Sequence, residues 1–253
     1  MRHRQSWIAP TILGVVLIAA WALLTNLGII SAYALPAPQE VARRVVTGFQ
    51  AGFLGASLSQ TLLEALLGCV VAALIGVPLG FGIAHFKALS ASVEPYLAAS
   101  QAIPAIAIAP LLVAWIGYGT SPIVVLCTIM VVFPVIISTA VGVRHIDQEL
   151  IGAARLDGAG GFTLLRTIEL PLAGPNIMAG LRTGFTLSIT GAVVGEMVIG
   201  GQRGLGIELV TAQHVNDIPG MFAAIAVLAT VAVALYLLLR WLEYRVVRAV
   251  AAE

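Results

Sequence analysis

The sequence predicts an all-α integral membrane protein with about six transmembrane helices. Of its 253 residues, 60% are hydrophobic and only 10% are charged, proportions that a soluble globular domain does not reach. Six helices of about 20 residues each, plus their connections, use most of the chain. We therefore expect a single transmembrane domain over residues 1–253, with no room for a separate soluble catalytic domain.

Six apolar runs mark the expected spans. They cover residues 7–30, 61–84, 97–117, 121–142, 177–200 and 221–242. If the N-terminus is cytoplasmic, ten of the thirteen basic residues fall on the cytoplasmic side, as the positive-inside rule favours. These are Arg2, Arg4, Lys87, Arg144, Arg155, Arg166, Arg182, Arg240, Arg245 and Arg248, whereas Arg43, Arg44 and Arg203 fall outside. A multi-pass protein with both termini in the cytoplasm is expected, because the first run is too long for a signal peptide and lacks a cleavage site.

The connections carry their own signals. After the prolines of 35–38, apolar residues recur at helical spacing over 39–50, which predicts a short interfacial helix on the outer side. Pro104 and Pro110 fall within the third span and predict a kink or an unwound turn there. The short connection 117–122 predicts a tight hairpin between the third and fourth spans. Three Gly-xxx-Gly pairs, beginning at 76, 180 and 191, favour close helix packing, either within one subunit or between two.

The segment 144–171 is a long polar stretch between two apolar runs. Asp147 is suited to the N-cap of a short helix over 148–157, and Gly158 to the left-handed residue that ends it. After Ala159-Gly-Gly161 the chain restarts, with Phe162, Leu165 and Ile168 on one stripe, and we expect this second helix to stop before Pro171. Ala153 and Ala154 add little volume, so another surface can approach the first helix closely.

This segment resembles the EAA loop of ATP-binding cassette (ABC) importer permeases, whose pattern is Glu-Ala-Ala, three residues, Gly, nine residues, Ile-x-Leu-Pro. Six of its seven defining positions match, and Gly152 stands where the family usually has Glu. The resemblance implies that this loop carries a cytoplasmic coupling helix that docks on an ATPase subunit. The implied coupling residues are Glu149, Gly152, Ala153, Ala154, Arg155, Asp157, Gly158, Ile168, Leu170 and Pro171.

Weaker motifs extend the resemblance over nearly the whole chain and narrow it to the nitrate, sulfonate and taurine type of permease, which also includes riboflavin and thiamine-precursor permeases. They are Leu35-Pro-x-Pro38, Gly76-Val-Pro-Leu-Gly80, Ile103-Pro-Ala-Ile-Ala107, Trp115-Ile-Gly117, Phe133-Pro134, Gly142-Val-Arg144, Glu196-Met197 and Gly204-Leu-Gly206. The implied fold is that of a type I ABC importer transmembrane domain in a bacterial cytoplasmic membrane. The implied partners are ABC ATPase subunits, an extracytoplasmic substrate-binding protein, a second copy of the permease and membrane lipid, with no nucleic acid.

No GxxxxGK[ST] phosphate loop occurs, and Lys87 is the only lysine. The chain is therefore expected to be a translocation subunit rather than an enzyme, with ATP and Mg²⁺ bound by the partner ATPase. The four histidines lack metal-ligand spacing, and Cys69 and Cys127 lie in apolar runs, so no metal site is expected. No Ser/Lys or His/Asp/Glu cluster predicts intramembrane catalysis.

Candidate pathway residues are Gln101, Pro104, Pro110, Trp115 and Glu196. Glu196 and Glu64 are the acids placed most deeply in apolar sequence, where an ionisable group marks function by default. Glu196 is also suited to brace the turn toward Gly200-Gly201. The alternative to an ATP-driven importer is a transporter or channel driven by an ion gradient through Glu196. The substrate, a small organic or anionic solute, is not encoded in any residue set of the sequence.

Overall fold

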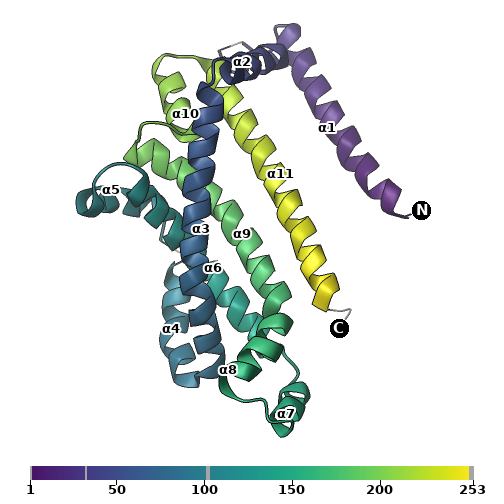
Figure 1. Ribbon diagram of the computed structural model, residues 1–253. Helices are drawn as coiled ribbons and strands as arrows, with labels where there is room; N and C mark the ends of the chain where they lie inside the picture. The colour runs from purple at the N-terminus through teal and green to yellow at the C-terminus, as the bar shows by residue number, and fades with distance from the viewer. Residues whose placement is uncertain (1, 32, 101–102, 251–253) are drawn as a thin grey trace.

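The computed structural model describes residues 2–31, 33–100 and 103–250, and over these residues the chain is helical with no strand (Figure 1). The α-helices are α1 (Arg2–Asn26), α2 (Pro38–Gln50), α3 (Phe53–His85), α4 (Lys87–Ser100), α5 (Ala105–Ile116), α6 (Thr120–Arg144), α7 (Gln148–Leu156), α8 (Gly161–Leu164), α9 (Leu170–Ile199), α10 (Leu205–His214) and α11 (Ile218–Val250). A π-helical turn, Leu165–Glu169, joins α8 to α9.

The core of the bundle is α6, which packs between α3 and α9. Glycines of both neighbours face α6 so closely that a Cβ would collide with it. A Cβ on Gly80 of α3 would lie 2.5 Å from Thr139 Cβ, and one on Gly184 of α9 would lie 2.6 Å from Val131 Cγ1. The Gly-xxx-Gly pairs therefore serve close packing within one subunit, the first of the two possibilities that the sequence left open.

The predicted spans correspond to the helices with one exception. Four helical stretches are long and apolar enough to cross a membrane, namely Phe53–His85, Thr120–Arg144, Gly161–Ile199 and Ile218–Trp241. Most of the first predicted span, 7–30, lies in α1, whose apolar part Ile12–Asn26 is shorter than these four. The short connection predicted before the fourth span is confirmed, and it joins α5 to α6. The chain is therefore a multi-pass membrane protein.

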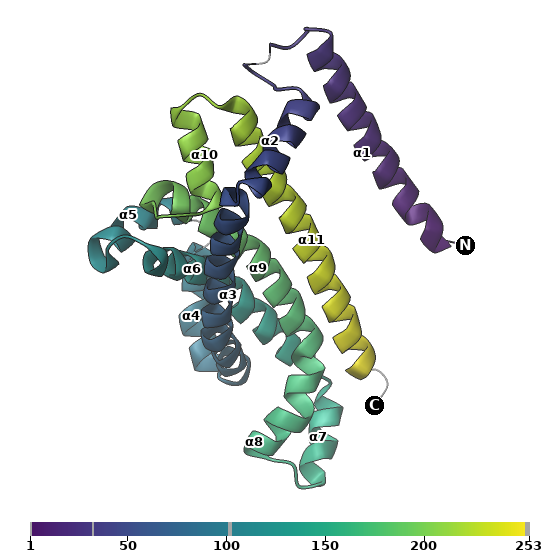
Figure 2. The same cartoon turned by 45° about the horizontal axis from the view of Figure 1, so that its top comes forward.

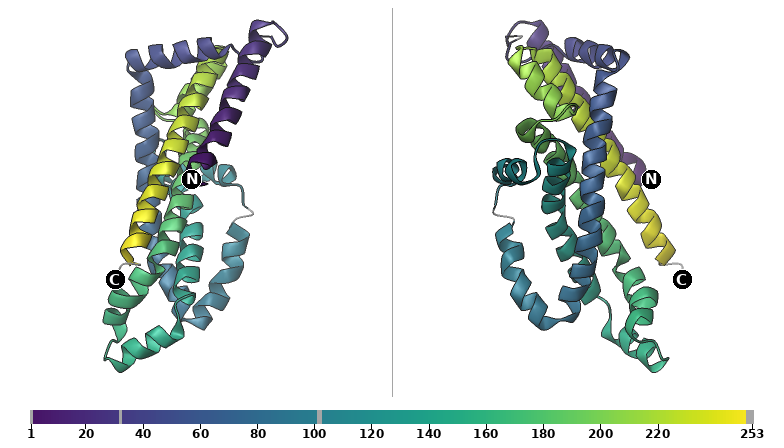
Figure 3. Two further views of the ribbon diagram at one scale, coloured as in Figure 1. Left: turned by 90° about the vertical axis from the view of Figure 1, so that its right-hand side faces the viewer. Right: turned by 60° about the vertical axis from the view of Figure 1, so that its left-hand side comes forward.

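The third predicted span, 97–117, is not one helix, so its expected extent was wrong. The chain instead forms α4 alongside α3 and α6, and then starts again as α5. Pro104 is the N-cap of α5 with extended backbone (φ −62°, ψ 120°), as a helix start at a proline requires. Pro110 is accommodated inside α5. The unwound turn expected at Pro104 is thus confirmed, and it separates the two helices (Figure 3).

The helix that follows α7 does not stop before Pro171, contrary to expectation. The chain passes from α8 through the π-helical turn directly into α9, where Pro171 occupies the first turn. Proline lacks a backbone N–H and its ring crowds the carbonyl four residues earlier, here that of Thr167. The wider π-helical turn before it absorbs this conflict, so the polar segment and α9 form one continuous rod.

The two ends of the bundle are capped differently. At one end, the amphipathic helix α2 lies across the tops of α3 and α11, as Figure 3 shows, and it confirms the short helix predicted over 39–50. At the other end, α7 and α8 project beyond α3 and α6 (Figure 2). We call these the α2 end and the coupling-loop end. Helix α10, which the sequence did not predict, packs against α3, α9 and α11 near the α2 end.

Candidate functional site

Helix α7 forms for the local reasons expected. Asp147 accepts a hydrogen bond from the backbone N–H of Glu149 at 2.8 Å and so caps the first turn. Gly158 adopts φ +90°, a left-handed conformation that ends the helix at little cost for glycine. The glycine corner then turns the chain into α8. The predicted pair of short helices at a glycine corner is therefore confirmed in its first helix and its corner.

The two alanines of the EAA-like motif face different ways. Ala154 is half-buried and packs against an apolar cluster that includes Ile151 of α7, Phe81 of α3 and Val143 of α6. Ala153, the next residue around the helix, is exposed. Ala153 therefore faces outward, whereas Ala154 fixes α7 to its own bundle.

The remaining predicted coupling residues divide in the same manner. Ile168 and Pro171 are half-buried, and Ile168 joins the cluster beneath α7. Those that stay exposed are Glu149, Gly152, Arg155, Asp157, Gly158 and Leu170. The space around Gly152 is open, because a Cβ added there would have no atom of the described residues within 4 Å. Most of the predicted coupling residues are therefore uncovered.

Three apolar side chains on this surface escaped the reasoning from sequence. Leu156 is 90% exposed, Phe162 is 73% exposed and Leu150 is 54% exposed. Together with Ala153 they form what we call the coupling surface. Large apolar side chains at the tip of a polar loop, outside the lipid-facing helices, mark a protein contact. The signal in the sequence was Leu156 beside the helix-ending Asp157-Gly158, since a core side chain rarely lies there.

A groove of about 540 Å³ runs between α5, α6 and α9. It is lined mainly by apolar side chains, with the hydroxyls of Ser138 and Thr183 among them, and includes Ile103, Phe133 and Pro134. Pro104 begins α5 beside this groove, whereas Pro110 and Trp115 lie exposed along α5, Trp115 at 73%. Gln101 lies outside the described residues.

Glu196 lies at the α2 end of α9 and is almost fully buried, with 1% of its surface exposed. Its Oε1 accepts from Thr61 Oγ1 of α3 at 2.6 Å, and its Oε2 accepts from the backbone N–H of Gly206 at 2.6 Å. The latter group belongs to the first turn of α10, whose unpaired N–H groups favour an anion. Glu196 therefore ties α3, α9 and α10 together.

The glycines near Glu196 are required by this contact. Gly204 has φ +154°, and a Cβ there would lie 2.2 Å from Glu196 Cδ. A Cβ on Gly206 would lie 2.4 Å from the carbonyl oxygen of Val193. Ser57 adds a second tie, donating to Glu208 Oε1 of α10 at 2.8 Å. We call these bonds the α10 clamp.

Glu64 lies beside this clamp and is equally buried. Its Oε1 accepts from Gln60 Nε2 at 2.8 Å, while its Oε2 is buried without a donor and the carboxyl meets that of Glu196. Glu64 also lines a polar pocket of about 570 Å³ with Gln60, Gly119, Thr120, Gly201, Gln202 and Arg203. The two acids are thus neighbours, and Glu64 is the one that borders a cavity.

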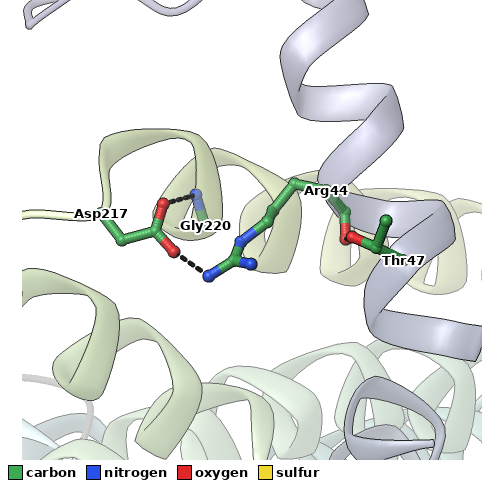
Figure 4. Close-up of polar contacts among 4 residues, drawn as sticks. All are labelled: Arg44, Thr47, Asp217 and Gly220. Carbon is green, nitrogen blue, oxygen red and sulfur yellow. Dashed lines mark hydrogen bonds and ion pairs between the residues drawn. The ribbon is translucent and has the colours of Figure 1, made fainter. Parts of the chain in front are cut away.

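A third tie at the α2 end is exposed. Arg44 of α2 forms an ion pair with Asp217, which precedes α11 (Figure 4). Asp217 also accepts from the backbone N–H of Gly220 at 3.0 Å and so caps α11. The pair links α2 to the corner between α10 and α11.

Comparison with known proteins agrees with this architecture. Residues 76–248 match the family model described as binding-protein-dependent transport system inner membrane component. The riboflavin transport system permease protein RibX of Chloroflexus aurantiacus is 40% identical over 232 residues, which cover 92% of this chain and 86% of that protein. The taurine transport system permease protein TauC of Escherichia coli is 32% identical, covering 91% of this chain and 85% of that protein.

The fold has a solved counterpart in the inward-facing MetNI methionine ABC transporter. A chain of that structure superposes with a TM-score of 0.67 at 21% identity, covering 79% of this chain and 97% of its own length. The aliphatic sulfonates permease SsuC of Bacillus subtilis is also similar, with 30% identity over 91% of this chain and 83% of that protein. The family match, the relatives and the shared fold lead to one conclusion: this chain belongs to the binding-protein-dependent transport system inner membrane components, the permeases of ABC transporters.

Proposed function

We propose that this chain is the translocation subunit of an ATP-driven importer in a bacterial cytoplasmic membrane. Two copies form the pathway, separate ABC ATPase subunits bind ATP and Mg²⁺, and an extracytoplasmic binding protein delivers the solute. Residues 144–171 face the cytoplasm, as do both termini. The whole chain, 1–253, acts as one permease domain.

The observation that carries this proposal is the coupling surface and its connection to the bundle. Leu156 and Phe162 are exposed beyond the membrane helices, where an ATPase subunit can cover them. The same segment continues without interruption into α9. Movement of a bound ATPase would therefore reach a long helix that packs against the core.

The solute we propose is a small organic molecule of the riboflavin or sulfonate kind. The riboflavin permease RibX supports the first and TauC and SsuC the second. The groove between α5, α6 and α9 is mostly apolar with few hydroxyls, which suits an organic solute with limited polar recognition. In this proposal Gln101, Pro104, Pro110 and Trp115 shape the pathway along α4 and α5. Glu196 supports the gate by holding α10 rather than by binding solute.

Energy coupling decides between this proposal and a gradient-driven transporter. The chain is reconstituted in vesicles with and without its ATPase, with binding protein outside and ATP inside, and uptake of riboflavin and taurine is measured. Uptake should require ATP and a catalytically intact ATPase and should survive collapse of the proton gradient. Gradient-driven uptake without the ATPase, lost in Glu196→Gln, would instead establish the secondary transporter.

Ala153 provides the matched test of the docking surface. Ala153→Asp adds volume and charge at the exposed face of α7, so stimulation of ATP hydrolysis by the loaded binding protein should vanish while the protein still inserts. Ala153→Ser adds one oxygen and should keep most of the stimulation. Equal stimulation in both variants would contradict the assignment of this surface.

Orientation is tested by labelling. Cysteines are introduced at Thr163 near the coupling-loop end and at Gln213 in α10, both exposed, in a background without Cys69 and Cys127. A membrane-impermeant thiol reagent should label position 213 from outside and position 163 only after permeabilisation. Labelling of both from one side would reject the proposed topology.

A further inference from the structure

One polar contact at the coupling-loop end involves none of the defining residues of the EAA-like motif, because Glu169 fills its variable position between Ile168 and Leu170. His85 is the last residue of α3, and Glu169 is the last residue of the π-helical turn before α9. His85 Nε2 lies 3.0 Å from Glu169 Oε1, and only 2% of Glu169 is exposed. A buried carboxylate at this position requires a partner, and the imidazole is that partner.

The hydrogen bonds define the chemistry of the contact. His85 Nδ1 lies 2.9 Å from the carbonyl oxygen of Phe81, which can only accept, so Nδ1 carries a hydrogen. An ionised Glu169 also only accepts, so Nε2 carries a hydrogen as well. An imidazole with hydrogens on both nitrogens is a cation. With Glu169 ionised, the contact is a charge-assisted hydrogen bond from Nε2, and the other ring nitrogen of His85 is held by the Phe81 carbonyl of α3.

The position of this bond gives it a mechanical consequence. Glu169 lies in the segment that joins α7 and α8 to α9, and His85 ends a different membrane helix. The apolar cluster beneath α7 also touches α3 through Phe81, but apolar contacts are non-directional. A directional hydrogen bond fixes both the distance and the angle between the two helices.

We propose that His85 and Glu169 are positioning residues that make α3 follow the coupling loop, so that movement of the ATPase reaches α3 as well as α9. This proposal rests on the proposed function. Without the pair, the loop would still dock and still move α9, but the coupling-loop end of α3 would follow it less closely.

The experiment uses the complete complex of permease, ATPase and binding protein in vesicles. His85→Gln and Glu169→Gln remove the charges while preserving size, and His85→Lys retains a cation within reach of Glu169. The quantity measured is the number of solute molecules imported per ATP hydrolysed, with riboflavin as probe, or taurine where the parent complex imports it instead. We expect both Gln variants to lower this ratio by about fivefold or more, the lower range of a coupling between two sites, with His85→Lys within about twofold of the parent.

A distance measurement supplies a readout that a purely structural role would not change. Spin labels are placed at Phe86, which is exposed directly after α3, and at exposed Thr163 in α8, in a background without Cys69 and Cys127. In the parent complex, the distance between the labels should stay the same with and without ATP and vanadate. In either Gln variant, it should change or broaden when ATP and vanadate are added.

Different results reject the role of the His85–Glu169 pair and the proposed function. If uptake and hydrolysis fall together at a constant ratio, or if the Gln variants fail to assemble with the ATPase, the pair is only a stabilising contact and the proposal is rejected. An unchanged ratio and label distance in both Gln variants also rejects it. If the parent complex shows no ATP-dependent uptake at all, the proposed function fails, and this proposal fails with it.

Discussion

The two ends of the bundle differ in how their functional side chains are covered. At the α2 end, the buried carboxyl of Glu196 finds its partners within the chain, since it accepts from Thr61 and from the first turn of α10. At the coupling-loop end, large apolar side chains such as Leu156 and Phe162 remain uncovered. The α10 clamp is complete in one subunit, whereas the coupling surface is not covered by any of the described residues.

This difference determines how each end should respond to mutation. Changes within the α10 clamp remove partners from buried groups and should reduce stability before they affect any partner. Changes on the coupling surface remove no contact of the isolated chain and should affect binding alone. The following predictions test that separation, beginning with the largest expected effect.

Replacing Glu196 by Leu should destabilise the isolated chain by about 1–3 kcal/mol, because the N–H of Gly206 loses its acceptor in a buried site and Thr61 Oγ1 keeps only the carbonyl of Ser57. The release of α10 should also expose the adjoining loop. The measurements are the melting temperature in detergent and the rate of trypsin cleavage at Arg203. Glu149→Leu, at an exposed position, is the control. Equal melting temperatures for Glu196→Leu and the parent would show that the clamp is not needed for stability.

Replacing Leu156 by Ser should leave the melting temperature unchanged, because the side chain is 90% exposed. It should weaken binding of the ATPase by about tenfold, as expected when a buried leucine is lost from an interface. Binding is measured by titrating labelled ATPase against the permease in nanodiscs. Leu237→Ser, exposed on the long helix α11, is the control that should not alter ATPase binding. A lower melting temperature for Leu156→Ser with unchanged binding would show that Leu156 stabilises the isolated chain and does not bind the ATPase.

The ion pair of Arg44 with Asp217 should matter much less than the clamp. Its side chains are 47% and 21% exposed, and solvent weakens such pairs to about 0–1 kcal/mol. Arg44→Gln should therefore shift the melting temperature only slightly, and the shift should shrink further at high salt. A loss as large as that of Glu196→Leu would mean that α2 is held mainly by this pair.

The same contrast explains which features could be predicted from sequence. The N-cap at Asp147 and the helix end at Gly158 depend on neighbouring residues, so they were predicted correctly. The partners of Glu196 could not be predicted, since Thr61 is 135 residues away and only the folded bundle brings them together. Helix α10 was missed for the same reason, because its first turn is stabilised by α3 and α9 rather than by its own sequence.

The errors in the predicted helices have a related cause. Whether a proline interrupts a helix depends on the backbone conformation around it. Pro104 itself has extended backbone as the N-cap of α5, and the predicted span divides in two. At Pro171 a π-helical turn precedes the ring, and the helix continues. The sequence alone did not distinguish these two surroundings.

The smallest expected effect concerns Gly152, where the family pattern usually has Glu. A Cβ at this position meets no atom within 4 Å, so larger residues fit without displacement. Gly152→Ala should stabilise α7 by up to about 1 kcal/mol, because glycine in a helix interior carries the larger entropy loss on folding. Gly152→Glu should stabilise it less, because the new acid favours Arg155 three residues later but repels Glu149 three residues earlier. Hydrogen exchange of the α7 amides in the isolated chain measures this order, and Gly152→Glu,Glu149→Gln should recover the stability of Gly152→Ala. Slower exchange in Gly152→Glu than in Gly152→Ala would show that Glu149 does not oppose an acid at position 152, and that a glutamate there has a stabilising partner beyond α7.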